Sequence, residues 1–186
     1  MYTLALYNAI ANDGALVRPR LYKRLVNKAI GVDTVLPVTY INEKICSREN
    51  AAILRDMLKQ VVWGEHGTGR MLRDEHVALA GKTGTAYMIE NGQYVTSKKR
   101  LTFCGYFPAD KPKYSCIVMT CAPKANWFGA ASTSGQIMKN IALTMYSRGM
   151  LGDHSDYRAE EPHNELPRVS GIGAAQPHDT REPLDR

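Results

Sequence analysis

The sequence predicts one α+β domain, in which an antiparallel sheet packs against helices, followed by a polar tail. Three β-rich runs follow one another near the middle of the chain, and successive neighbouring strands most simply form an antiparallel meander. Segments with apolar residues at helical spacing stand before and after these runs. With 186 residues and 44% hydrophobic content, the chain is large enough to bury one sizeable core.

The chain opens with an expected helix and two short strands. Residues 1–12 are dense in apolar residues and end in Asn12-Asp13-Gly14, so we expect a buried helix that is already in progress at residue 1. Because that helix has no preceding cap, we expect the missing part of the domain to lie upstream. Residues 17–26 and 35–41 mix β-branched, aromatic and basic residues, which predicts two peripheral strands.

A second helix should begin after Ser47, a good N-cap, and end near Trp63-Gly64. We place the three strands of the sheet at 77–88, 101–107 and 114–121. A polar turn at Thr96-Ser97-Lys98-Lys99 should separate the first two strands. The last helix is predicted at 132–146 and should pack on the sheet through Ile137, Met138, Ile141 and Met145.

Charge is distributed unevenly along the chain. Residues 1–150 carry 20 Lys and Arg against 10 Asp and Glu, whereas residues 151–186 carry 4 against 8. The basic residues are scattered, which is typical of a solvated surface, and we expect no nucleic-acid partner. No run approaches the roughly 18 apolar residues of a membrane-spanning helix.

The four cysteines do not indicate a metal site. Cys46, Cys104, Cys116 and Cys121 form no Cys-x-x-Cys pair, and no histidine lies near them at a metal-ligand spacing. Cys104 and Cys116 fall on two arms of one predicted hairpin, so a disulfide is conceivable, but buried free thiols are expected. We expect neither a metal nor another cofactor.

Chemistry-bearing residues gather at Lys82-Thr83-Gly84-Thr85, on the first strand of the predicted sheet. Gly81-Lys82-Thr83 also suggests a phosphate-binding loop. That motif would need a glycine where this chain has His76 and a helix after the threonine, where it has Gly84-Thr85, so we reject it. On a strand, Lys-Thr-Gly instead resembles the third motif of the penicillin-recognising serine acyltransferases.

The flanking segments strengthen this resemblance. Leu6 to Gly14 comes first, then Val17-Arg18-Pro19, then Gly67-Thr68-Gly69-Arg70 just before the motif. In this order and spacing, they are similar to the C-terminal part of the transpeptidase domain of a class B penicillin-binding protein, the cell-division type especially. The resemblance covers roughly residues 1–150 and implies a partial penicillin-recognising serine transpeptidase (β-lactamase-like) fold.

Each motif residue has a chemical role that fits the resemblance. The ammonium of Lys82 can attract a peptide carboxylate and join a catalytic proton network. Thr83 and Thr85 share one face of a strand, from which their hydroxyls can reach the same carboxylate. Gly84 leaves room for the substrate backbone, and the N–H of Thr85 resembles one donor of the family's oxyanion hole. Without its flanks, such a lysine is usually only a solvated edge residue.

Two motifs that the family's chemistry needs are absent from the 186 residues. Neither Ser-x-x-Lys, which supplies the nucleophile, nor Ser-x-Asn occurs anywhere. Thr96-Ser97-Lys98-Lys99 has a hydroxyl three positions before a lysine, but it is not predicted at a helix start. We therefore expect the chain to be inactive by itself. The segment Gly67-Thr68-Gly69-Arg70 is either an ordinary loop or part of the cleft rim.

Two functions stay open at this point. In the first, the intact protein cross-links peptidoglycan stem peptides that end in D-Ala-D-Ala, is inhibited by β-lactams and meets cell-wall synthesis or division proteins. In the second, it is a non-catalytic sensor or scaffold. The resemblance implies the extracytoplasmic face of the inner membrane, with an anchoring helix that this chain lacks. Residues 151–186 are an acidic, Pro-rich linker or tail, with a resemblance to the opening of a PASTA module.

Overall fold

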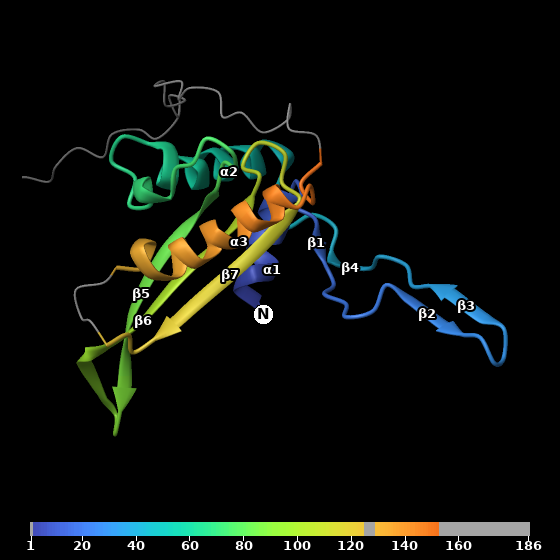
Figure 1. Ribbon diagram of the computed structural model, residues 1–186, viewed down its shortest axis with the longest axis horizontal. Coiled ribbons are helices and arrows are strands. Elements are labelled where there is room, and N and C mark those ends of the chain that lie inside the picture. Colours follow the sequence, from blue (N-terminus) through green and yellow to red (C-terminus); the bar gives the residue numbers. More distant parts are fainter. Residues whose placement is uncertain (1, 125–128, 153–186) are drawn as a thin grey trace, which may run out of the picture.

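A three-stranded antiparallel sheet forms the centre of the computed structural model, which describes residues 2–124 and 129–152 (Figure 1). Its strands are β5 (Ala80–Glu90), β6 (Gln93–Phe107) and β7 (Tyr114–Cys121), adjacent in that order. The predicted α+β class and three-stranded meander are confirmed. Of the tail predicted at 151–186, residues 153–186 lie outside the described residues.

Helices cover both faces of this sheet, because side chains alternate between the faces along each strand. One apolar cluster lies between the sheet and α3 (Gln136–Ser147), and it includes Leu79, Phe103 and Met138. The other cluster lies on the side of α1 (Tyr2–Ala11) and α2 (Arg48–Trp63), and it joins Ala80 and Tyr106 to Leu58. The prediction that the last helix packs on the sheet is confirmed.

The first two helices lie where the sequence predicted them, but the prediction that the first is buried is wrong, since only Ala9 and Ile10 of α1 are buried and Tyr2 is 92% exposed. α1 ends before Gly14, whose φ of 90° is readily adopted only by glycine, and the Gly14 N–H donates to Ala9 O at 2.8 Å. α2 is capped by Ser47, whose hydroxyl accepts from the Asn50 N–H at 3.2 Å. Within the described residues, none of the helices has both the length and the apolar character needed to cross a membrane.

The packing face of α3 differs from the expected one. A π-helical turn, Ala131–Gly135, precedes the helix. The buried residues of α3 itself are Met138 and Ala142. Ile137 and Ile141 remain 44% and 40% exposed, so the prediction that they share the packing face is wrong. Met138 and Ala142 are four residues apart and lie above one another on one face, which turns the isoleucines to its flank.

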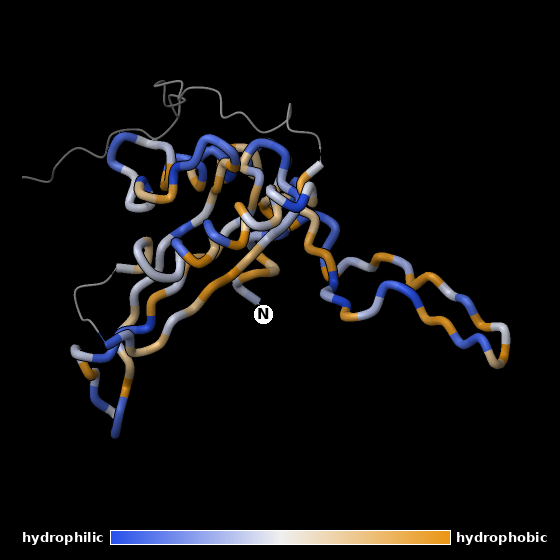
Figure 2. Tube along the Cα trace, viewed as in Figure 1, coloured by the Kyte–Doolittle hydropathy of each residue, from blue (hydrophilic) through white to orange (hydrophobic). Residues whose placement is uncertain are grey.

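The segment between α1 and α2 forms four short strands, not the two predicted. β1 (Leu16–Val17) pairs with β4 (Tyr40–Asn42), while β2 (Arg24–Asn27) and β3 (Val32–Val35) form a separate exposed hairpin that projects from the body (Figure 1). Prolines explain the difference, since Pro19 and Pro37 cannot donate to a sheet ladder and interrupt the predicted runs. Figure 2 shows apolar residues along this projecting hairpin.

The hairpin between β5 and β6 corrects the predicted turn. Thr96-Ser97-Lys98-Lys99 lies inside β6, where a register shift pairs Lys99 with Tyr87 but Val95 with Met88. The chain reverses instead at Asn91-Gly92, whose φ angles are 51° and 79°. Asn-Gly is favoured in a two-residue hairpin turn because both positions need positive φ. The residues that extend β6 here, 96–99, are polar and none of them is buried, so they show no alternation of apolar and polar residues. This part of β6 was therefore not predicted from the sequence.

All four cysteines are free, and the strand register explains why Cys104 and Cys116 do not bridge. Cys104 lies opposite Ile117, whereas Cys116 lies opposite Gly105. Residues offset by one position point to opposite faces of a sheet, so the two thiols diverge. Burial, followed by the proximity of Cys116, raises the pKa of the Cys104 thiol to about 12.

Thiol labelling of the native chain should therefore be selective. We expect iodoacetamide at pH 8 to modify the exposed Cys121 readily and to leave Cys104 unmodified until the protein unfolds, because only an accessible thiolate reacts. Peptide mapping by mass spectrometry after short pulses of reagent, with and without denaturant, measures this. Equal labelling of the two cysteines in the native protein would contradict the described position of β6.

Candidate functional site

The predicted site residues lie on β5, at the edge of the sheet. Lys82 pairs across to Cys104 and Thr85 to Leu101, while the opposite edge of β5 has no partner among the described strands. Lys82, Gly84 and Thr85 are exposed, and Thr83 is half-buried. The motif therefore presents polar side chains and free backbone groups along an accessible strand edge, where an extended peptide can add as a further strand.

Burial changes abruptly at the start of this strand. Residues 77–80 are almost completely buried, and exposure begins at Lys82. Between them, Gly81 lies opposite Gly105, and a Cβ on Gly105 would come within 2.0 Å of Ala80 O. This close approach of β5 and β6 needs a glycine, and it anchors the strand immediately before the motif.

The connector that leads into β5 is anchored to α3. The ammonium of Lys139 donates to Arg73 O at 2.8 Å and forms an ion pair with Asp74 at 3.1 Å. The ring of His76 stacks on Tyr146, also on α3, with centroids 5.3 Å apart. These contacts hold the segment between α2 and β5 against the body of the domain.

The Lys82 ammonium lies close to the Thr83 hydroxyl, although neighbouring side chains leave a strand on opposite faces. Lys82 Nζ donates to Thr83 Oγ1 at 3.2 Å and to Thr83 O at 3.0 Å. The long lysine side chain therefore reaches around the edge of the strand. A positive charge and a hydroxyl are thus brought to one point, which suits an incoming carboxylate.

A residue to which the sequence assigned no chemical role completes this group. Thr68, in the loop after α2, has its hydroxyl oxygen 3.1 Å from that of Thr83. The sequence left this segment open between an ordinary loop and part of the cleft rim, and the structure packs it against the end of α2. Its signal in the sequence was the threonine between Gly67 and Gly69, since paired glycines often mark a close backbone approach.

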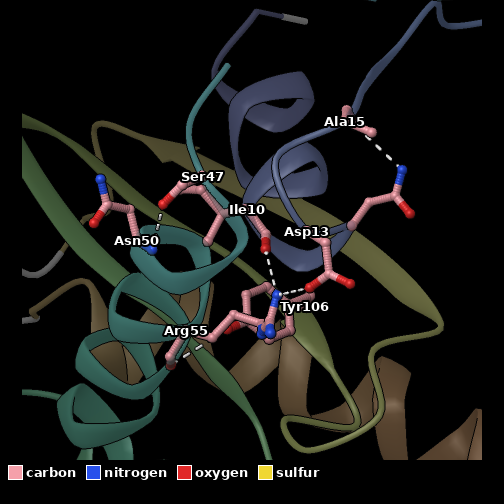
Figure 3. Close-up of polar contacts among 8 residues, drawn as sticks. Ile10, Asp13, Ala15, Ser47, Asn50, Arg55 and Tyr106 are labelled. Carbon is pink, nitrogen blue, oxygen red and sulfur yellow. Dashed lines mark hydrogen bonds and ion pairs between the residues drawn. The ribbon is translucent and has the colours of Figure 1, made fainter. Parts of the chain in front are cut away.

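Polar contacts join α1, α2 and β6, as Figure 3 shows. Arg55 on α2 donates to Ile10 O at 3.2 Å and pairs with Asp13 just beyond α1. The Tyr106 hydroxyl donates to Arg55 O at 3.4 Å, which links the same point to β6. Burial raises the pKa of Tyr106, so the phenol stays protonated and able to donate.

In the described part of the chain, no group of three or more His, Cys, Asp or Glu side chains could hold a metal ion. The groups that β5 offers to a ligand are Lys82, Thr83, Thr85 and the strand backbone. Together these groups can bind an anionic, extended ligand. None of them is placed as an activated nucleophile.

The fold and its polar edge strand define the class of penicillin-recognising α+β domains. A crystal structure of penicillin binding protein 3 from Mycobacterium tuberculosis superposes with a TM-score of 0.68 at 30% identity, covering 84% of this chain and 37% of that one. The chain belongs to the penicillin binding protein transpeptidase domain family, whose model matches residues 2–143. The resemblance inferred from the motifs is confirmed.

Curated relatives agree with this assignment. Penicillin-binding protein PbpB of Mycolicibacterium smegmatis is 33% identical over 159 residues, covering 77% of this chain and 23% of the relative. A peptidoglycan D,D-transpeptidase FtsI homolog of Nephroselmis olivacea is 35% identical over 115 residues, which cover 61% of this chain and 16% of that relative. The chain spans about a quarter or less of the length of these relatives, so it is part of a transpeptidase domain.

Proposed function

We propose that this chain supplies the substrate-binding strand of a peptidoglycan D,D-transpeptidase. The observation that carries the proposal is the position of Lys82-Thr83-Gly84-Thr85 on an edge strand whose outer side is unpaired within the described residues. A stem peptide ending in D-Ala-D-Ala adds along this edge as an extended strand. Its C-terminal carboxylate meets Lys82 and the hydroxyls of Thr83 and Thr85.

The backbone of β5 contributes the second part of the proposal. The N–H of Thr85 serves as one donor to the oxyanion that develops on the scissile carbonyl. Gly84 suits the position beside the substrate, because the strand carries no side chain there, and apart from its chain neighbours the nearest described atom to a Cβ would be 3.7 Å away. The substrate backbone can therefore lie alongside Gly84.

The remaining catalytic groups must come from outside these 186 residues. The acyl-enzyme needs a serine activated by a lysine, and Ser-x-x-Lys and Ser-x-Asn are both absent. In the intact protein, that serine accepts the acyl group from the stem peptide and passes it to the amine of a neighbouring stem. β-Lactams react with the same serine, and the related penicillin binding protein 3 has been crystallised with aztreonam and with ampicillin.

The family assignment also supports proposals on domains, location and partners. Residues 1–150 form the C-terminal portion of the transpeptidase domain, and 151–186 a linker or tail. The intact protein works in the cell envelope, on the extracytoplasmic face of the inner membrane, with cell-wall synthesis or division proteins. A non-catalytic sensor or scaffold would keep the same strand. The transpeptidase and the non-catalytic protein differ in whether the intact protein contains the serine motifs.

By itself, the chain is expected to bind acetyl-D-Ala-D-Ala reversibly and to form no covalent adduct with penicillin. Binding should be weak, with a dissociation constant on the order of 1 mM, because the groups of the serine motifs are absent from these residues. Titration of the ¹⁵N-labelled chain should shift the amide signals of Thr83, Gly84 and Thr85. Intact-mass spectrometry after incubation with a fluorescent penicillin should show no mass gain.

The matched control is acetyl-D-Ala-D-Ala amide, which has the same backbone but no carboxylate. If the amide binds equally well, or if the shifts fall elsewhere in the chain, carboxylate recognition by β5 is wrong. A stoichiometric penicillin adduct on a serine or threonine would show instead that this chain carries its own nucleophile.

A further inference from the structure

Thr68 approaches the site from a part of the chain that precedes β5. It lies in the loop between α2 and a short 3₁₀ helix, Arg70–Leu72. Its side chain is exposed, yet its Oγ1 lies 3.1 Å from Thr83 Oγ1 across 15 positions of sequence. Such a long-range contact between the hydroxyls of an exposed and a half-buried threonine needs a loop that is held in place.

The loop is held in place by its glycines. The Gly69 N–H donates to Val61 O at 2.8 Å, and the Gly67 N–H donates to Gly64 O at 3.0 Å. A Cβ on Gly67 would come within 2.3 Å of Val61 O, and one on Gly69 within 3.2 Å of the same atom. The backbone on both sides of Thr68 therefore packs directly on the last turn of α2, with no room for a side chain at Gly67 and only a tight fit for one at Gly69.

An arginine adds to this rigidity. The guanidinium of Arg73 donates to the carbonyl oxygens of Val62, Trp63 and Gly64, each at 2.9 Å. These carbonyls lie at the C-terminal end of α2, where intrahelical donors run out and where a cation is favoured. The end of the helix and the loop that presents Thr68 thus form one hydrogen-bonded unit.

Proton counting shows what Thr68 can do for Thr83. A hydroxyl donates one hydrogen bond and accepts two, and an ammonium only donates. Thr83 Oγ1 accepts a hydrogen bond from Lys82 Nζ. The Thr83 hydroxyl can therefore accept one more hydrogen bond and donate one. A carboxylate only accepts, so when it binds, Thr83 must direct its proton to the carboxylate. Thr68 can then donate into the remaining acceptor position without moving.

We propose that Thr68 is a positioning residue, whose hydroxyl fixes the rotamer of Thr83 and so keeps the Thr83 hydroxyl and the Lys82 ammonium aimed at a peptide carboxylate. This inference rests on the proposed function of β5 for its ligand. The contact itself does not depend on that function, since both hydroxyls belong to this chain.

The test uses a pair of substitutions that separates the hydroxyl of Thr68 from its methyl group. Thr68→Val keeps the shape and loses the hydroxyl, whereas Thr68→Ser keeps the hydroxyl. In the ligand-free ¹⁵N,¹³C-labelled chain, three-bond couplings report the χ1 rotamer of Thr83. We expect one rotamer in the wild type and in Thr68→Ser, and rotamer averaging in Thr68→Val.

The second readout is the binding of acetyl-D-Ala-D-Ala, which the titration of the amide signals measures. Thr68→Val should raise the dissociation constant about fivefold to tenfold, as expected for one lost hydrogen bond, and Thr68→Ser should stay within about twofold of the wild type. Thr96→Val, in the irregular part of β6, is the matched control and should change neither readout. In the Thr83→Val background, Thr68→Val should have no further effect.

The outcomes separate the two proposals. If the wild type does not bind the dipeptide, the function proposed for β5 is wrong, while the couplings still decide the role of Thr68. If Thr83 keeps one rotamer in Thr68→Val, or if the serine and valine variants lose affinity equally, the positioning role is overturned. An additive loss in the double variant would also overturn it, because the two hydroxyls would then act independently.

Discussion

Lys82→Ala is expected to slow penicillin acylation by roughly 10²–10³-fold in an enzyme that contains this segment together with the serine motifs. Such an enzyme can be made by joining residues 1–150 to the upstream part of the transpeptidase domain of M. smegmatis PbpB. Among the described residues, the Lys82 ammonium donates hydrogen bonds to Thr83 on the same strand, and Lys82 is exposed. Its loss should therefore change the free energy of unfolding by about 0.5 kcal/mol or less.

The measurement compares acylation rates and melting temperatures of the wild type and the variant. Lys98→Ala is the matched control, because Lys98 is another lysine of the same hairpin and pairs with Glu90, away from the motif. We expect Lys98→Ala to leave acylation unchanged. An unchanged acylation rate in Lys82→Ala would refute the role of the motif, while a large drop in its melting temperature would show that Lys82 is structural.

Gly105→Ala should destabilise the fold by about 3 kcal/mol or more, because the new methyl group has no room and backbone atoms would have to move. Its Cβ would lie 2.0 Å from Ala80 O and 2.7 Å from Gly81 Cα, both on the neighbouring strand β5. Since this is the point at which β5 is anchored before the motif, the damage should spread to the site. Urea unfolding followed by circular dichroism measures the loss.

Gly84→Ala provides the comparison within the same strand pair. Its Cβ would be 3.7 Å from the nearest atom, Cβ of Thr102, which is ordinary contact. We therefore expect Gly84→Ala to change the free energy of unfolding by less than about 1 kcal/mol. If Gly105→Ala unfolds at the same urea concentration as the wild type, then β5 and β6 do not approach as closely as described.

Local patterns in the sequence predicted much of the fold. α2, with its Ser47 cap, and β7 were placed almost to the residue, because caps and apolar spacing act within a few positions of the chain. The Lys82–Thr85 motif was assigned to a strand for the same reason. The extension of β6 through Thr96–Lys99 was not predicted. It pairs with β5 without burying one face, so the sequence there shows no apolar alternation.

Long-range pairing is what the sequence could not supply. β1 and β4 are joined by a segment that contains another hairpin, and no local pattern predicts that they pair. The contact between Thr68 and Thr83 is of the same kind, since it depends on how tightly the glycine loop packs on α2. A threonine between two glycines is compatible with a loose connector and with a fixed one.

The sequence by itself determined the chemical identity of the site, because Lys82, two hydroxyls and a glycine in consecutive positions define which groups a strand can offer. It also determined that no Ser-x-x-Lys occurs in these 186 residues. Only the tertiary structure decided that this strand lies at the sheet edge and that Thr68 meets Thr83. The reason is physical: a side chain's chemistry is local, whereas its neighbours and exposure are set by packing between distant segments.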